Sequence, residues 1–313
     1  MLAESKSGAA KIIANLPTLL AFLTDEQRVT LSHEVKDLVM DATYEGLTLD
    51  MNKDFTTFND PSLGNCFTFN HVNGSKIYKA RRTGIKGGLR VMLKINTNEY
   101  LPWDDTEGIA IYIHPIGRDI YLESNKHLAR SGGEDQIIMR KSTFKRLGGR
   151  FGKCANDRKT AQSFYYPGSY SVDGCFRSCY QDSVEKYCGC MVSSYPRRKD
   201  AQQCTVDKLA CMAKMINDRG DPYFWPECTC PQPCYDEEFG LSTSRIPFDT
   251  KTLCPNQSLN NLSTTNCDMS TVVMPNEFKN QFDLFKSTVL IFFKNLEVIV
   301  NVEEEKFGVS CHD

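Results

Sequence analysis

The sequence predicts an α+β protein that contains a disulfide-rich region. Apolar residues recur at helical spacing near the start, alternate at every second position further along, and give way to a dense cluster of cysteines. The 313 residues are 41% hydrophobic and 24% charged, with a formal net charge of -2. A chain of this length and composition can bury substantial cores, in one composite domain or in two.

The first 50 residues are predicted to be helical. Thr24 followed by Gln27 is a capping-box pattern, which opens a helix through about Met40. The apolar residues between Val29 and Val39 would supply the buried positions of this helix.

From residue 64 onward the hydrophobic period changes to two. Apolar residues alternate along 89–95 and 109–113, which predicts two strands that each bury one face. The segments 241–248 and 288–300 are also predicted to be strands, with a short amphipathic helix around 277–285 between them.

Fourteen cysteines are present, and ten of them lie between Cys154 and Cys234. A zinc site would favour C-x2-C pairs with nearby histidines, but all five histidines lie outside this region. A catalytic thiol would need only one cysteine and a base. The pattern therefore favours a disulfide framework, which implies an oxidising compartment.

Four of these cysteines have matching spacings. A helix that Ser171 can cap would place Cys175 and Cys179 on one face, about 6 Å apart along its axis. In the segment CTCPQPC, Cys228 and Cys230 occupy alternate positions of an extended chain, roughly 6.6 Å apart on one side. An antiparallel helix and extended segment could thus be joined as Cys175 to Cys230 and Cys179 to Cys228.

A second set of four cysteines has similar spacings, but these spacings do not determine which cysteines are bonded to each other. Cys188 and Cys190 alternate in CGC and would face Cys204 and Cys211, which share a face if that stretch is a helix. Thr205 could cap this helix.

The glycan acceptor triplets indicate export from the cell, but neither a secretory signal nor a membrane-spanning segment is evident in the sequence. Three glycan acceptor triplets, at Asn73, Asn256 and Asn261, agree with an extracellular location. The start of the chain is not a secretory signal, and the longest apolar run, 289–293, is far shorter than the roughly 20 residues that span a bilayer. We therefore expect these residues to be part of a longer chain that supplies targeting and membrane segments.

The residues favour a binding or gating role. The basic runs 79–82 and 197–199 are too brief to predict a nucleic-acid surface. His114 ends an alternating strand without a serine or cysteine motif beside it, and the acidic residues at 104–107 lack the spacing of a calcium loop. No enzyme activity, metal or cofactor is expected.

Six segments in order carry a family resemblance. They are GNCFTFN (64–70), GLRVMLKINTNEYLP (88–102), GIAIYIHP (108–115), YSVDGCFRSCYQDSVEKYCGC (170–190), CTCPQPC (228–234) and IFFKNLEV (291–298). Over about 35–310 the chain resembles the extracellular domain of the degenerin/epithelial sodium channel family, most of all its nematode degenerin-like members.

The resemblance implies a hand-shaped domain of a trimeric, amiloride-sensitive sodium channel in the plasma membrane, with this region extracellular. The subunits would form a homo- or heterotrimer, cross the membrane through segments outside this chain, conduct sodium ions and bind no nucleic acid. The implied divisions are finger helices (1–55), palm and β-ball strands with finger loops (56–150), a disulfide-laced thumb (151–238), a palm strand and knuckle (239–285), and a palm strand leading to a second membrane helix (286–313).

The resemblance also implies roles for particular residues. The implied disulfides, beyond the two argued above, are Cys154 to Cys234, Cys188 to Cys211 and Cys190 to Cys204, and Cys254 and Cys267 are also expected to be oxidised. Cys66 usually pairs outside this region in relatives, so it is left to Cys311 or remains free. Phe151 resembles the aromatic residue that couples thumb and pore, although it could equally be an ordinary packed aromatic residue.

Two departures from the family are informative. Ala42 and Leu49 occupy the places of a finger cysteine pair. Acid-sensing relatives carry carboxylates where this chain has Ala213 and Asn217, so proton gating through that site is disfavoured. Mechanical gating, peptide gating and constitutive opening stay open. The alternative function is a secreted disulfide-rich binding protein, which a cleavable signal peptide in the full transcript would indicate.

Overall fold

The computed structural model describes residues 23–96, 107–121, 124–248 and 286–303, together with positions 20 and 100. Helices and strands are mixed throughout these residues, as the sequence predicts for an α+β protein. The main body is a six-stranded sheet with the order β2-β1-β5-β10-β8-β9. Its strands are β1 (Val39–Tyr44), β2 (Leu47–Thr48), β5 (Leu89–Lys94), β8 (Gly133–Lys145), β9 (Tyr235–Pro247) and β10 (Lys286–Val302).

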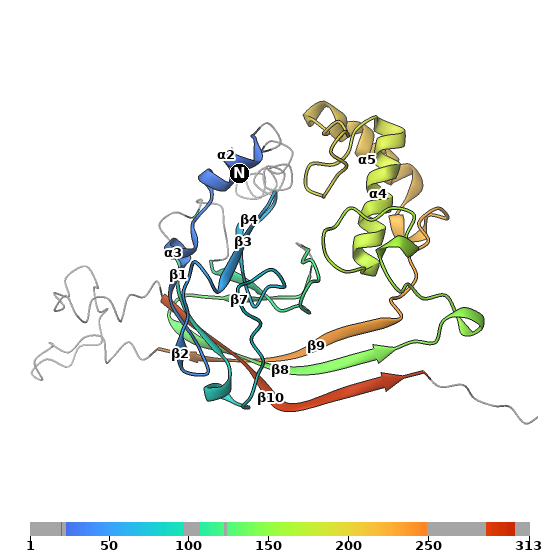
Figure 1. Cartoon of the computed structure of the whole chain (residues 1–313). Coiled ribbons are helices and arrows are strands. Elements are labelled where there is room, and N and C mark those ends of the chain that lie inside the picture. The colour runs from blue at the N-terminus through green and yellow to red at the C-terminus, as the bar shows by residue number, and fades with distance from the viewer. Residues whose placement is uncertain are drawn as a thin grey trace, which may run out of the picture.

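Strand β10 organises the sheet because it pairs on both sides. It runs antiparallel to β5 and parallel to β8, with a register shift between Phe293 and Val298 on the β8 side. Strands β8 and β9 form a long antiparallel ladder from Gly133 opposite Pro247 to Lys145 opposite Tyr235. The three long strands lie side by side in Figure 1.

Alternation explains why these segments form a sheet. In β5 every second side chain is buried, and Val91 and Leu93 join the core with Ile137 of β8 and Val289 of β10. Ile137 is completely buried. The strands predicted at 89–95, 109–113, 241–248 and 288–300 are all present, and β9 begins six residues before its predicted start.

Two small antiparallel pairs stand apart from the main sheet. They are β3 (Phe55–Asp60) with β4 (Gly64–Phe69), and β6 (Ile109–Tyr112) with β7 (Lys126–Ala129). The rings of Tyr44, Phe69 and Tyr78 pack together and hold the β3–β4 hairpin against β1.

The continuous helix predicted through about Met40 is wrong. The Thr24 capping box forms, but α2 spans only Asp25–Leu31 and is followed by a single turn, α3 (Val35–Leu38). The chain then enters β1, where Val39 and Ala42 are buried against β5. Burial in the sheet therefore outweighs the helical pattern, and part of the segment expected to be finger helices is strand.

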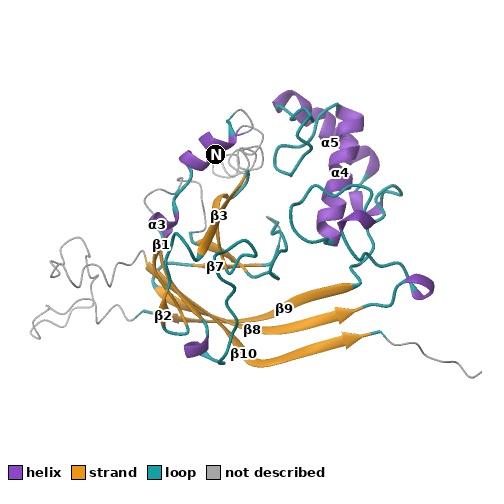
Figure 2. Ribbon diagram, viewed as in Figure 1, coloured by secondary structure: helices purple, strands orange, loops and turns teal. Residues whose placement is uncertain are grey.

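A helical insertion separates β8 from β9, and we call residues 155–233 the disulfide lobe. Its α-helices are α4 (Val172–Cys188) and α5 (Leu209–Arg219), which Figure 2 shows rising from one end of the sheet. Short 3-10 turns occur at η5 (Arg158–Thr160), η6 (Val206–Lys208) and η7 (Pro222–Phe224) within the lobe, and at η2 (Ile85–Gly87) and η4 (Gly149–Phe151) outside it.

The ends of the lobe helices show one expected cap and one correction. Ser171 caps α4, because its side chain accepts a hydrogen bond from the backbone N–H of Gly174. Thr205 does not cap α5, since its hydroxyl bonds to Asp207 and α5 begins only at Leu209. Cys204 therefore lies before the helix, beside Met191, and not on a helical face shared with Cys211.

Several expectations fall outside the described residues. They concern Cys254, Cys267, Cys311, Asn256, Asn261, the acidic positions 104 and 105, and the helix expected around 277–285.

Candidate functional site

The disulfide lobe joins the sheet through a narrow connection, which we call the neck (residues 145–155 and 233–235). Lys145 and Tyr235 are the last paired residues of β8 and β9. Just beyond them, Cys154 and Cys234 form a disulfide with a Cα–Cα distance of 4.9 Å, and Ala155 bridges to Pro233. The two chain segments that enter and leave the lobe are thus covalently tied at its base.

Hydrogen bonds tie the neck to the end of β10 as well. The backbone N–H of Arg146 donates to the carbonyl of Cys234 at 2.8 Å. The N–H of Leu147 donates to Glu303 Oε2 at 2.9 Å, and the N–H of Glu303 donates to the carbonyl of Lys145 at 3.0 Å. Entry to the lobe, exit from it and the end of β10 therefore meet at one place.

Phe151 lies at the tip of the neck. It ends the short turn η4, is 47% exposed, and has the Arg150 guanidinium 4.6 Å from its ring centroid. Of the three glycines in this loop, only Gly149 has a φ in the left-handed region, at 66°. The loop is therefore a defined turn with one conformation that favours glycine.

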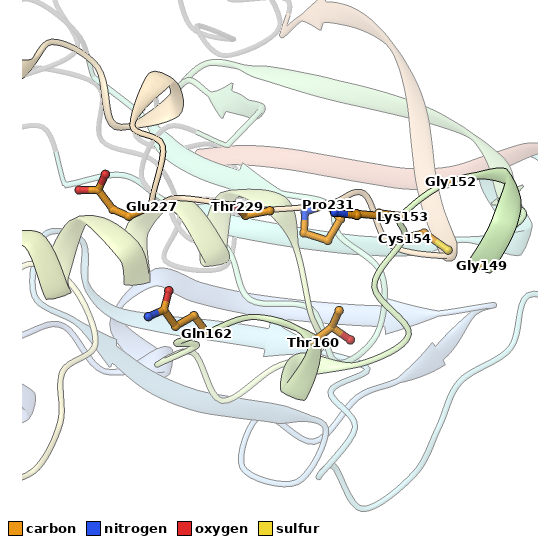
Figure 3. A pocket seen from close by; sticks show the side chains of 9 residues that line it. All are labelled: Gly149, Gly152, Lys153, Cys154, Thr160, Gln162, Glu227, Thr229 and Pro231. Atoms are coloured by element: carbon orange, nitrogen blue, oxygen red, sulfur yellow. The ribbon is translucent and has the colours of Figure 1, made fainter.

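A small pocket lies between the neck and the lobe. It has a volume of about 440 Å³, and Figure 3 shows Gly149, Gly152 and Cys154 of the neck opposite Thr160 and Glu227 of the lobe. The pocket leaves space beside the Cys154–Cys234 disulfide, so the neck turn is not packed directly against the lobe.

Four further disulfides cross-link the lobe. Cys175 is bonded to Cys230 and Cys179 to Cys228, the two pairs that the spacing suggests, with Cα–Cα distances of 5.7 and 5.6 Å. The other two pairs are Cys188 with Cys211 and Cys190 with Cys204. All ten cysteines from Cys154 to Cys234 are thus paired in disulfides in the structure.

Packing complements the disulfides. Trp225 is 4% exposed, and its indole N–H donates to the carbonyls of Arg219 and Gly220, both at 3.2 Å. The Arg219 guanidinium lies 4.0 Å from the Trp225 ring centroid. Val184 and Met215 join this core from α4 and α5. The lobe is therefore built to keep its shape.

A second attachment holds the lobe to the loop 114–121, which we call the bracing loop. The backbone N–H of Gly168 donates to Asp119 Oδ2 at 2.7 Å, and the N–H of Ser169 donates to the carbonyl of Gly117 at 2.7 Å. Arg118 pairs with the buried Asp236 at the start of β9. The lobe therefore contacts the body of the protein on its side as well as at its base.

Burial changes the protonation of two groups in the bracing loop. It raises the pKa of Asp119, while the hydrogen bond from Gly168 acts in the opposite direction. It lowers the pKa of His114, whose Nδ1 lies 3.1 Å from the carbonyl oxygen of Pro115. His114 is thus a half-buried residue within the packed loop.

Other positions singled out in the sequence are spread over the molecule. Asn73 is exposed in the turn that follows β4, and Ala213 and Asn217 are exposed one turn apart on α5. Cys66 on β4 is the one described cysteine outside a disulfide, and burial raises the pKa of its thiol to about 12. None of these positions belongs to the neck.

Sequence reasoning missed the bracing loop. Arg118, Asp119 and Gly168 lie in irregular segments, where no hydrophobic period marks a contact. The glycine offers one signal in retrospect, because a Cβ at Gly168 would lie 2.7 Å from the backbone carbonyl oxygen of Gly117. Such close approach of two backbones requires glycine.

Comparisons with known proteins agree with this architecture. Residues 5–311 match the family model described as "Amiloride-sensitive sodium channel". The chain is 29% identical over 299 residues to degenerin mec-10 of Caenorhabditis elegans, which covers 94% of this chain and 40% of that protein. It is 29% identical over 292 residues to degenerin mec-4 of Caenorhabditis briggsae, covering 92% of this chain and 36% of that protein.

A human protein also matches. The chain is 32% identical over 204 residues to the epithelial sodium channel subunit alpha of Homo sapiens, covering 63% of this chain and 30% of that protein. The chain thus spans well under half the length of these relatives. Within the described part of the chain, no helix is long and apolar enough to cross a membrane. The match over nearly the whole chain shows that it belongs to the amiloride-sensitive sodium channel family, with the degenerins and epithelial sodium channel subunits.

Proposed function

We propose that this chain is the extracellular gating region of a sodium channel subunit that assembles as a trimer in the plasma membrane. Its family and relatives support an ion-channel role and not an enzymatic one. Five disulfides suit an oxidising exterior, and Asn73 is exposed where a glycan could be attached. In this proposal the disulfide lobe corresponds to the thumb and the six-stranded sheet to the palm.

The observation that carries the proposal is the meeting point at the neck. Leu147 and Lys145 hydrogen-bond Glu303, so a displacement of the lobe base acts directly on the end of β10. In the proposed subunit this end continues toward the pore. The lobe would move as a lever, because its cross-links resist internal deformation.

Phe151 is the proposed contact between the neck and the membrane part of the subunit. Its ring is half exposed, although large aromatic side chains gain free energy by burial. An aromatic side chain at the tip of a defined turn is well placed to pack against another segment of the subunit. The proposal is compatible with mechanical gating, peptide gating and constitutive opening. Proton gating is disfavoured, because Ala213 and Asn217 provide no carboxylates for proton sensing on α5.

Voltage clamp of the full-length subunit tests the proposal. Expressed in oocytes, it should give a sodium current that amiloride blocks, and Phe151→Ala should uncouple stimulus from current while surface protein persists. The matched control is Phe224→Ala, because Phe224 is 80% exposed on the lobe and belongs to neither segment of the neck. It should leave the current unchanged.

Surface biotinylation separates the possible failures. Normal gating in the Phe151→Ala channel would remove this residue from the mechanism. Loss of surface protein would instead identify Phe151 as a folding residue. If the wild-type subunit reaches the surface and carries no sodium current, alone or with related subunits, the channel proposal itself fails.

A further inference from the structure

A large cleft separates the disulfide lobe from the β3–β4 hairpin. Its volume is about 1420 Å³, the bracing loop forms its floor, and α2 lies at its upper rim. Figure 1 shows the lobe and the hairpin standing on the same side of the sheet. Residues of both line the cleft. The neck pocket described above is separate from it.

The lobe wall of the cleft is cationic. Among the lobe residues that line it there are five basic side chains and no carboxylate. The basic residues are Arg158, Arg177, Arg197, Arg198 and Lys199. Arg198 is paired with Glu185 and Asp200, but no described side chain pairs with the exposed Arg197 or Lys199. The excess positive charge therefore lies at the cleft rim.

Two of these arginines are oriented by neighbouring groups. Arg158 donates to the carbonyl oxygens of Tyr166 and Pro167 at 3.3 and 2.9 Å, and its charge also acts on Asp119. Arg177 stacks on Tyr195, with its guanidinium 5.1 Å from the ring centroid. The planar guanidinium of arginine matches the geometry of a carboxylate.

The cationic segment 193–199 is anchored from behind by a buried glutamine. Gln181 of α4 is fully buried, accepts a hydrogen bond from the N–H of Val192 at 2.7 Å, and donates to the carbonyls of Val192 and Pro196 at 3.0 and 3.1 Å. A wall fixed in this way loses little conformational entropy when it binds a ligand.

The opposite wall differs in character. The hairpin presents the hydroxyls of Thr56, Thr57 and Thr68 and two apolar side chains, Phe58 and Val72, which are 38% and 54% exposed. The carboxylates that line the cleft have partners nearby. Asp25 of α2 pairs with Arg28, and Asp60 of β3 accepts the N–H groups of Ser62 and Leu63. Asp119 in the floor accepts the N–H group of Gly168. The cleft thus sets a cationic wall against an apolar and hydroxyl-bearing one.

We propose that this cleft binds an extended acidic peptide whose carboxylates face the lobe and whose apolar side chains face the hairpin. Carboxylates pair well with arginine forks, and successive side chains of an extended peptide point to opposite sides. The volume exceeds the range of roughly 300 to 1,000 Å³ that is usual for small-molecule pockets, which favours a peptide over a small anion. The two-sided lining favours it over a uniformly polar sulfated polysaccharide. This inference does not depend on the channel proposal.

Asn73 also lines the cleft, at its hairpin side. A glycan there would narrow the entrance, so binding should be measured in an Asn73→Gln background. The probe is a fluorescent, capped peptide of alternating glutamate and leucine, about eight residues long. Two matched probes separate the contributions: glutamine replaces glutamate in one, and serine replaces leucine in the other.

Fluorescence anisotropy with the oxidised 313-residue chain tests the proposal. The glutamate-leucine peptide should bind at least about tenfold more tightly than either matched probe, and its affinity should fall as salt screens the charges. Equal binding of all three probes would overturn the proposal. So would binding of a heparin oligosaccharide without binding of the peptide, which would indicate a polysaccharide site.

Charge reversal locates the site. Arg197→Glu with Lys199→Glu should weaken binding of the glutamate-leucine peptide by about tenfold. Lys79→Glu with Lys86→Glu is the matched control, because both lysines are exposed, lie outside the cleft lining and change the net charge equally. An equal loss in both variants would contradict a specific cleft.

A variant of the other wall keeps the test decisive if the charge reversal disturbs folding. Phe58→Ser should weaken the glutamate-leucine peptide and leave the glutamate-serine peptide unchanged. The same small effect on both peptides would place the apolar contact elsewhere and overturn the two-sided binding mode.

Discussion

The disulfide lobe and the six-stranded sheet are stabilised in different ways. The lobe has six cysteines within or packed against its largest core cluster of nonpolar residues, with Val184, Met215 and Trp225. Among the described residues, the buried core of the sheet contains no cysteine, and its aliphatic side chains come mostly from β1, β5, β8 and β10. One region thus depends on covalent links between its segments, and the other on burial of side chains between strands.

This difference determines what each region can transmit. A cross-linked lobe resists internal change, whereas a sheet can adjust along its strands or at irregular positions such as the register shift of β10. The neck connects the two, and its Cys154–Cys234 bond extends the covalent framework to the sheet edge. Movement of the lobe should therefore be taken up by the neck and the sheet, and not within the lobe.

The largest expected effect comes from removing a covalent link. Replacing Cys175 and Cys230 together by alanine should lower the free energy of unfolding of the lobe by roughly 2 to 5 kcal/mol, because the bond closes a long loop. The two cysteines are 55 residues apart. Hydrogen exchange should show faster exchange in α4 and little change in β5 and β10.

The control for this change is Cys66→Ser, since Cys66 forms no disulfide in the described structure. It should leave the exchange of α4 unchanged. Equal acceleration of exchange in the lobe and the sheet of the Cys175/Cys230 variant would show that they unfold as one unit, which would break the comparison.

A smaller effect is expected where the lobe meets the bracing loop. In Gly168→Ala the new Cβ would lie 2.6 Å from Asp119 Oδ2 and 2.7 Å from the carbonyl oxygen of Gly117. Relieving this overlap should cost about 1 to 3 kcal/mol and loosen the lobe from its side support. Thermal unfolding and exchange at 117–121 would measure it.

Gly240→Ala serves as the matched glycine substitution. Its Cβ would have only an ordinary contact, 3.8 Å from the carbonyl oxygen of Arg140. A loss of stability equal to that of Gly168→Ala would mean that the bracing contact is not specific.

Much of the fold could be predicted because it follows from local patterns. The alternation of apolar and polar residues in 89–95 indicates which face of that strand is buried. The helical spacing of Cys175 and Cys179 does the same for α4. The failure at Val39–Tyr44 has a tertiary cause, because these residues become strand by pairing with β5. The residues near position 40 in the sequence do not indicate that this segment will pair with β5.

The candidate site was less predictable for a related reason. Phe151 could be singled out only through its resemblance to a family position, and the hydrogen bond between Leu147 and Glu303 joins residues 156 positions apart. The basic run 197–199 is too brief to predict a binding surface from the sequence. It becomes a candidate binding surface only when folding places it opposite the β3–β4 hairpin.

The smallest effect on stability, and the sharpest contrast with the lobe, concerns the sulfur of Cys66. Burial raises the pKa of this thiol to about 12, so the thiolate that reacts with alkylating reagents is scarce at neutral pH. Iodoacetamide should modify Cys66 at least about tenfold more slowly in the native chain than in the denatured chain near pH 8. The folded state keeps the thiol protonated, so its contribution to stability should be lost as pH rises from about 9 toward 12. Mass spectrometry of the peptide that contains Cys66 gives the rate directly. Equal rates in native and denatured chains would show that the β3–β4 hairpin opens readily and does not shield its sulfur.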